Sequence, residues 1–225
     1  MTVRGYFVTG TDTGVGKTCV SSALLLKLNQ QGKKAAGMKP VASGCDKTPD
    51  GLRNADAESL IKYSGIKLNY ADVNPYAFEA AIAPHLAAEK MGESISLDII
   101  LAAYEQLSRQ VNCVVVEGVG GWQVPLSHNE TMEDLAIRMN LPVIMVVGIR
   151  LGCINHALLT YQAIKASGLE CCAWIANQID PQMSCMEENI TAIHDRLDIP
   201  CWGVIPWGSD VSAESIVDKL IQPPI

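Results

Sequence analysis

Short apolar runs alternate with segments of helical periodicity along the whole chain. The apolar runs are rich in β-forming residues and lie near residues 6–10, 35–40, 113–117, 142–148, 171–177 and 201–206. The helical segments have apolar side chains every three or four residues and lie near 17–32, 55–63, 95–109, 132–139, 155–166, 184–196 and 212–221. Continuous apolar runs are typical of strands buried on both faces. The pattern predicts an α/β fold in which helices cover both faces of a parallel sheet, with ligands outside the carboxyl ends of the strands.

Composition supports one well-packed domain spanning residues 1–225, since 48% of the residues are hydrophobic and 18% are charged. The net charge of −7 and the lack of a lysine or arginine cluster argue against nucleic acid or an anionic membrane as a partner. The sequence shows neither a charged leader nor an apolar run of membrane-spanning length, so we expect a cytoplasmic protein. The eight cysteines show no Cys-x-x-Cys spacing, which favours reduced thiols over a disulfide or zinc site.

A glycine-rich loop, GTDTGVGKT, follows the first apolar run. A strand, a glycine loop, Gly-Lys-Thr and a helix in this order form the P-loop arrangement, which binds the phosphates of a nucleoside triphosphate. Gly14 and Gly16 allow the backbone to turn its N–H groups toward phosphate oxygens. Lys17 would reach the β- and γ-phosphates, and the Thr18 hydroxyl would bind Mg²⁺. Five residues rather than four separate Gly10 from Gly16, so this is a variant P-loop.

Charged residues stand at the ends of other predicted elements. Glu117 ends a run of four apolar residues, where P-loop proteins place their second magnesium-binding acid. Asn54 is typical of a helix N-cap, which puts Asp56 in the first turn, either as a complement to the helix dipole or as a magnesium ligand. Lys39, before Pro40, is either an ordinary surface lysine or a cation beside the phosphates.

The last strands carry candidates for contacts with the nucleobase and with an anion. Asn177 and Asp180 resemble the guanine-reading motif of GTPases, but Gln178 stands where that motif has lysine, so we expect a base contact without guanine selectivity. Gly152 and Asn155 mark a helix that starts near residue 156, either an anion site or a plain crossover helix. The segment IPWGSD, residues 205–210, closes the last strand on the base side.

Nine motifs, in order along the chain, resemble those of the dethiobiotin synthetases. They are GTDTGVGKT, KPVASG, GLRNADA, VNPYAF, APH, VEGVGGW, GCINHALLT, AN and IPW. In that family, CO₂ adds to one amine of 7,8-diaminopelargonic acid (7,8-diaminononanoate), and the carbamate attacks the γ-phosphate of MgATP. The second amine captures the carbamic-phosphoric anhydride, giving dethiobiotin, ADP and phosphate. The resemblance implies an ATP-dependent ligase of biotin biosynthesis, acting as a homodimer with shared active sites.

The resemblance also implies a role for each matching residue. Lys17, Lys39 and Thr13 would be catalytic, the lysines stabilising charge on the transferring phosphoryl group and Thr13 lying near the carbamate. Thr18, Asp56 and Glu117 would hold Mg²⁺. Ser43 would hold the carbamylated substrate, and its carboxylate would meet the partner's Gly152, Cys153, Ile154 and Asn155. The ATP contacts would be Gly14, Val15, Gly16, Lys17, Thr18, Cys19, Asp56, Glu117, Gly118, Val119, Gly120, Asn177, Gln178, Pro206, Trp207 and Gly208.

The chain departs from the family pattern at three places. Gly14 stands where some members have an acidic residue, which removes a possible nucleotide contact. Ala81 replaces a proline before the APH motif. The segment SDVSAE does not align clearly with the acidic segment that some members bring to the ribose, so the role of Glu214 is open.

Three other functions compete with this interpretation. ParA- or MinD-like switch ATPases share the variant loop but usually carry an additional lysine early in it, where this chain has Thr9, Gly10, Thr11 and Asp12. A GTPase is disfavoured by Gln178. A related amide-forming ligase of cobalamin synthesis would carry a glutaminase domain that this sequence lacks.

Overall fold

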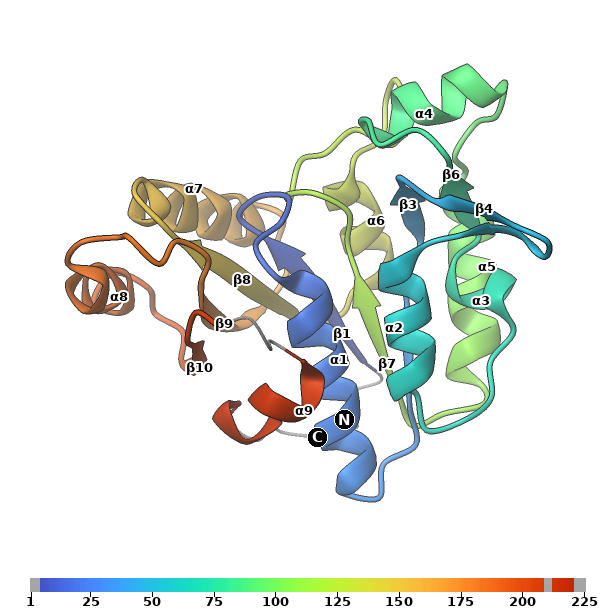
Figure 1. Cartoon of the computed structure of the whole chain (residues 1–225). Coiled ribbons are helices and arrows are strands. Elements are labelled where there is room, and N and C mark those ends of the chain that lie inside the picture. The colour runs from blue at the N-terminus through green and yellow to red at the C-terminus, as the bar shows by residue number, and fades with distance from the viewer. Residues whose placement is uncertain (1–4, 209–211, 221–225) are drawn as a thin grey trace.

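A six-stranded parallel sheet lies at the centre of the protein in the computed structural model, which describes residues 5–208 and 212–220 (Figure 1). Its strand order is β10-β9-β8-β1-β7-β2, and every neighbouring pair is parallel. The strands are β1 (Gly5–Gly10), β2 (Ala35–Met38), β7 (Cys113–Glu117), β8 (Val143–Ile149), β9 (Cys171–Gln178) and β10 (Cys201–Ile205). Each predicted apolar run forms one of these strands, so the predicted sheet is confirmed.

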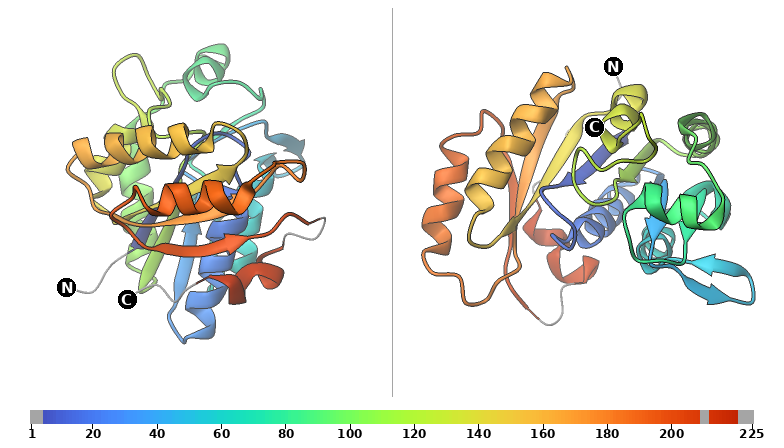
Figure 2. Two further views of the ribbon diagram at one scale, coloured as in Figure 1. Left: turned by 90° about the vertical axis from the view of Figure 1, so that its left-hand side faces the viewer. Right: turned by 90° about the horizontal axis from the view of Figure 1, so that it is seen from above.

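Helices cover both faces of the sheet, as predicted (Figures 1 and 2). One face packs against α1 (Lys17–Gln30), α2 (Ala55–Tyr63) and α9 (Ala213–Ile216), which continues as a 3₁₀ turn (Val217–Lys219). The other face packs against α5 (Leu97–Ser108), α6 (Met132–Met139), α7 (Cys153–Ala166) and α8 (Met186–His194). Side chains alternate between the faces, so Tyr6 and Val8 of β1 pack toward α1 and Phe7 packs toward the opposite layer.

Several short elements between β2 and α5 were not predicted. A small parallel sheet joins β3 (Val41–Ser43) to β6 (Tyr76–Phe78), and an antiparallel hairpin joins β4 (Asp46–Thr48) to β5 (Gly51–Arg53). Helices α3 (Tyr70–Val73) and α4 (Pro84–Met91) complete this region. Together these elements form a lobe beside the carboxyl edges of β2 and β7 (Figure 1).

Two predicted boundaries were wrong. The run at 35–40 leaves the central sheet after Met38, because the Lys39 N–H donates to the carbonyl of Val73 instead of a neighbouring strand. The chain then continues through Pro40 into β3. The helix expected near residue 156 begins at Cys153, because Gly152 takes the left-handed conformation with φ 94° and starts the helix directly after the turn.

The eight cysteines all lie in the described residues and form no disulfide there. Cys113 is fully buried in β7, and burial raises the pKa of its thiol to about 12. Within residues 5–208 and 212–220, no helix has both the length and the apolar character needed to cross a membrane.

Candidate functional site

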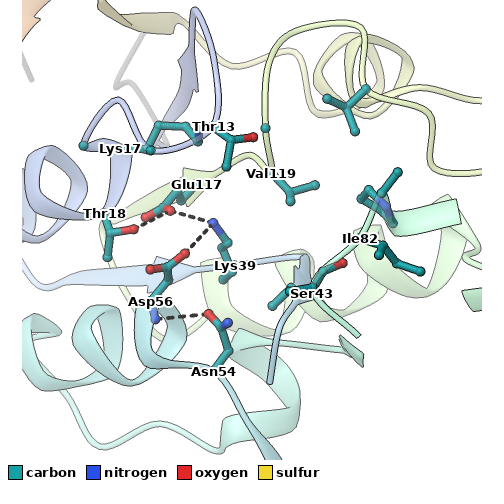
Figure 3. A pocket seen from close by; sticks show the side chains of 18 residues that line it. Thr13, Lys17, Thr18, Lys39, Ser43, Asn54, Asp56, Ile82, Glu117 and Val119 are labelled. Atoms are coloured by element: carbon teal, nitrogen blue, oxygen red, sulfur yellow. Dashed lines mark hydrogen bonds and ion pairs between the residues drawn. The ribbon is translucent and has the colours of Figure 1, made fainter. Parts of the chain in front are cut away.

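A cavity of about 660 Å³ lies beyond the carboxyl ends of β1, β2 and β7, at the edge where the fold predicts a ligand (Figure 3). Its walls come from the loops after these strands, from the first turn of α2 and from the segment leading into α4. The lining residues are Thr13, Gly14, Gly16, Lys17, Thr18, Lys39, Ala42, Ser43, Asn54, Asp56, Ala81, Ile82, Ala83, Pro84, Glu117, Val119, Gly120 and Val124. The sequence did not single out Ala42, Ile82 or Val124.

The glycine-rich loop forms one wall of the cavity. Gly14 and Gly16 both have positive φ, 74° and 92°, and Gly16 is the N-cap from which α1 starts at Lys17. The Lys17 ammonium donates to the carbonyl of Asp12 at 2.9 Å. Burial, followed by the nearby ammonium of Lys39, lowers the pKa of Lys17 from 10.5 to about 8. An anion in the cavity would therefore meet a helix N-terminus and a poorly solvated cation.

The glycine-rich loop also forms an ion pair with the residue that follows the neighbouring strand β8. Arg150, the residue after β8, pairs with Asp12 at 2.5 Å between Nη2 and Oδ2. The other carboxylate oxygen of Asp12 accepts the N–H of Thr13 at 2.7 Å. Neither Arg150 nor Asp12 was among the predicted site residues, although the position of Arg150, a charged residue directly after a buried strand, is typical of a site residue.

Lys39, Asp56, Glu117 and Thr18 meet at the floor of the cavity, and we call them the lysine–carboxylate cluster (Figure 3). The Lys39 ammonium lies 2.6 Å from Glu117 Oε1 and 3.1 Å from Asp56 Oδ2. It also donates to the Gly118 carbonyl at 3.3 Å, while the Thr18 hydroxyl donates to Glu117 Oε1 at 2.8 Å. The surface alternative for Lys39 is therefore wrong, since this residue is only 3% exposed.

The charges in this cluster stabilise one another. Burial alone would lower the pKa of Lys39, but Glu117 and Asp56 outweigh it and raise the pKa. Burial alone would raise the pKa of Asp56, but the Lys39 ammonium outweighs it and lowers the pKa. Lys39 is thus held protonated and Asp56 ionised.

The donor set of the cluster fits a magnesium ion. Glu117 Oε2 is buried and has no hydrogen-bond partner among the described residues, so one carboxylate oxygen remains for a cation. In the described part of the chain, no three His, Cys, Asp or Glu side chains converge into a metal site of their own. Two carboxylates and the Thr18 hydroxyl match the preference of Mg²⁺ for a few protein oxygens completed by water and phosphate.

The first turn of α2 places Asp56 in the cavity wall. The predicted N-cap is confirmed, because Asn54 Oδ1 accepts the N–H groups of Asp56 at 3.0 Å and Ala57 at 3.3 Å. The Asp56 side chain is 42% exposed and points toward Lys39 (Figure 3). Capping therefore fixes the start of the helix, and with it one carboxylate of the cluster.

Ser43 and the glycines after β7 also shape the cavity, and the glycines lie close to the P-loop residues Gly10 and Thr13. Ser43 ends β3, and its hydroxyl is buried without a hydrogen-bond partner among the described residues, so it remains available to a ligand. Gly120 has φ 62°, and a Cβ there would lie 2.7 Å from Val124 Cγ2. Because Gly120 has no side chain, the backbone at Val119 and Gly120 can lie directly against the cavity.

The residues expected around a nucleobase lie outside the cavity lining, beside the P-loop. Asn177 is buried and donates from Nδ2 to the carbonyl of Val15 at 2.8 Å. Gln178 Oε1 accepts the N–H of Trp207 at 2.8 Å, which ties the loop after β10 to β9. Pro206, Trp207 and Gly208 are exposed. The rest of the expected base-side loop, Ser209 and Asp210, lies outside the described residues.

Two acidic residues near this loop have other partners. Asp180 Oδ1 accepts the N–H of Gln182 at 2.9 Å in the turn after β9. Glu214 accepts the Tyr63 hydroxyl at 2.6 Å, with Lys62 at 3.8 Å, and so links α9 to α2. The Asp180 contact therefore stabilises a local turn, whereas the Glu214 contacts join two helices.

The helix start from Gly152 to Asn155 does not line the cavity of its own chain within the described residues. No described side chain caps the N-terminus of α7, which leaves its N–H groups suited to an anion. The neighbouring Leu151 is 90% exposed.

Sequence comparison finds close similarity to named enzymes. A family model described as an AAA domain matches residues 4–215. The "ATP-dependent dethiobiotin synthetase BioD" of Xanthomonas oryzae pv. oryzae is 53% identical over 218 residues, covering 97% of each chain. The protein of the same name from Cellvibrio japonicus is 46% identical over 225 residues, covering 100% of this chain and 99% of its own.

Solved structures show the same fold at low sequence identity. A chain of the MinC:MinD cell division protein complex of Aquifex aeolicus superposes with a TM-score of 0.57 at 17% identity, covering 92% of this chain and 82% of that chain. The signal recognition particle receptor FtsY of Elizabethkingia anophelis in complex with GDP gives 0.53 at 16% identity, covering 100% of this chain and 65% of that one. These similarities establish the P-loop fold of this chain.

Proposed function

The chain belongs to the ATP-dependent dethiobiotin synthetase family of its close relatives, and we propose that it closes the ureido ring of dethiobiotin with MgATP, CO₂ and 7,8-diaminopelargonic acid. The observation that carries this proposal is the lysine–carboxylate cluster beside the P-loop in a single cavity. Two lysines and a magnesium-binding donor set there supply the charge that phosphoryl transfer needs.

The geometry of the cavity and the resemblance to the dethiobiotin synthetases support the proposed roles on the nucleotide side. The N–H groups of the P-loop and the Lys17 ammonium would bind the phosphates, and Lys17 would exchange the Asp12 carbonyl for phosphate oxygens. Thr18, Asp56 and Glu117 would hold Mg²⁺, which supplies Lewis-acid stabilisation of phosphoryl charge when bound. Asn177, Gln178 and the loop at Pro206–Gly208 would lie around the adenine.

The proposed roles on the substrate side use Ser43, the P-loop residue Thr13 and the start of α7 of a second protomer. Ser43, with its available hydroxyl, would hold the carbamylated amine, and Thr13 would orient the carbamate toward the γ-phosphate. The uncapped start of α7, Gly152–Asn155, would bind the substrate carboxylate in the cavity of a second protomer. We propose a cytoplasmic homodimer with shared active sites.

A coupled assay tests the reaction. Phosphate release from MgATP and bicarbonate is measured with and without 7,8-diaminopelargonic acid, while mass spectrometry follows dethiobiotin in the same sample. We expect phosphate and dethiobiotin to appear together, and only when the diamine is present. Hydrolysis that is independent of the diamine and yields no dethiobiotin would refute the synthetase function and favour a switch ATPase.

Arg150→Ala is expected to weaken ATP binding by about fivefold, the size typical of a partly exposed ion pair. The substitution frees Asp12, which orients both the Thr13 N–H and the Lys17 ammonium. Calorimetric titration with a non-hydrolysable ATP analogue measures the effect. The matched control is Arg109→Ala, which breaks an exposed pair with Glu105 on α5. Equal dissociation constants for the two variants would contradict this role of Arg150.

A further inference from the structure

The one-turn helix α3 contacts α5, α2 and β2, the strand that ends just before Lys39. Tyr70 is its first residue and Asn74 is its C-cap, and the Asn74 N–H donates to the Tyr70 carbonyl at 2.8 Å. Asn74 is only 3% exposed. Neither side chain is among the described residues that line the cavity. Tyr70 and Asn74 can therefore affect the chemistry only through other residues that line the cavity.

The pair holds the backbone of Lys39. The Lys39 carbonyl accepts Asn74 Nδ2 at 2.7 Å, and the same amide group donates to the Tyr76 carbonyl at 3.1 Å. The Lys39 N–H donates to the carbonyl of Val73, the last residue of α3, at 2.8 Å. Lys39 lies between β2 and β3, outside the ladder of the central sheet. Both of its backbone polar groups are thus held by α3 and its C-cap.

The same pair holds the start of α2. The Tyr70 hydroxyl accepts the N–H of Asn54 at 2.7 Å and donates to Asn74 Oδ1 at 2.9 Å. Asn54 in turn caps the helix turn that carries Asp56. Burial raises the pKa of Tyr70 above 10.0, so the hydroxyl keeps the proton that it donates. The Arg53 guanidinium lies 4.2 Å from the centre of the Tyr70 ring and restrains the ring.

We propose that Tyr70 and Asn74 are positioning residues that set the distance between the Lys39 ammonium and the Asp56 carboxylate, 3.1 Å in the structure. One hydroxyl and one amide connect the two backbone segments that carry these groups. The inference rests on the proposed function, because its consequence is measured through the roles of Lys39 and Asp56. Side chains that orient metal ligands typically contribute about 10–100-fold to metal affinity or activity.

The test compares Tyr70→Phe with Tyr76→Phe. The Tyr76 hydroxyl accepts the N–H of Ser96, the N-cap residue of α5, at 2.9 Å. Tyr76→Phe therefore removes the same kind of hydrogen bond as Tyr70→Phe, but at the start of α5 instead of α2. For each variant we would measure kcat, KM for the diamine and thermal stability. Paramagnetic resonance would give the dissociation constant of Mn²⁺ with a non-hydrolysable ATP analogue.

Tyr70→Phe is expected to lower kcat and weaken Mn²⁺ binding by about 10-fold each, with KM for the diamine unchanged. Tyr76→Phe is expected to change neither kcat nor Mn²⁺ binding. A Tyr70→Phe protein that is only less heat-stable, with wild-type kcat and Mn²⁺ affinity, would overturn the inference. If the wild-type protein makes no dethiobiotin, the proposed function fails separately, and Mn²⁺ binding by the two variants still decides between a positioning role and a purely structural one.

Discussion

Replacing Lys39 with alanine is expected to lower kcat by about 10²–10³-fold, the usual cost of removing one charge-stabilising group from an active site. The Lys39 ammonium is buried at the cavity floor, 2.6 Å from Glu117 and 3.1 Å from Asp56. The effective dielectric constant of such a buried site is low, so the Lys39 ammonium interacts more strongly with nearby charges than a solvated lysine would. Steady-state kinetics with saturating MgATP and diamine measure the effect.

The same substitution is expected to destabilise the free protein. Glu117 is fully buried and would lose its nearest cation, and breaking a buried pair from one side typically costs about 3–5 kcal/mol. Added Mg²⁺ should recover part of this loss, because the freed carboxylates of Glu117 and Asp56 suit that ion. Thermal unfolding should therefore show a larger stabilisation by Mg²⁺ in the variant than in the wild type.

Lys47→Ala is the matched control for Lys39→Ala. Lys47 also pairs with a glutamate, at 2.7 Å from Glu79, but the two side chains are 74% and 57% exposed. Exposed pairs contribute little to stability, so kcat and unfolding temperature should stay close to wild type. An unchanged kcat in Lys39→Ala would exclude Lys39 from the catalytic set.

The central sheet could be predicted because its strands are long and apolar at nearly every position. Residues 113–117 and 143–147 are buried on both faces, and this leaves a continuous apolar run in the sequence. Apart from α2, which was predicted, the elements between β2 and α5 left no such pattern. Strands of three residues, such as β3 and β6, are too short to show a period, and their pairing joins segments far apart in the chain.

The candidate site could be predicted where local chemistry determines it. The P-loop, the Asn54 cap and the acid at the end of β7 each follow from a few consecutive residues. The contacts of Lys39 could not be predicted, because its partners Asp56 and Glu117 arrive from two other elements. The sequence contains Asn74 only as part of the matching motif VNPYAF. That motif does not indicate that Asn74 bonds to the carbonyl of Lys39.

Gly16→Ala is expected to lower kcat/KM for ATP by about 10²-fold, the size expected when a binding group is displaced by about 1 Å. Gly16 has φ 92°, and a Cβ there would lie 2.1 Å from Asn177 Nδ2. Asn177 would have to move and give up its bond to the Val15 carbonyl, which helps to hold the P-loop on β9. The left-handed conformation itself costs a residue with a Cβ about 1–2 kcal/mol. Calorimetric titration with an ATP analogue and steady-state kinetics measure both consequences.

Gly14→Ala separates these two causes. Gly14 also has a positive φ, 74°, but no described atom lies within 4 Å of where its Cβ would be. The variant therefore has the backbone strain but not the steric clash with Asn177. We expect ATP binding by Gly14→Ala to stay much closer to wild type than binding by Gly16→Ala. If the two alanine variants lose ATP affinity equally, strain alone explains the loss, and the contact between Asn177 and the loop has no part in nucleotide binding.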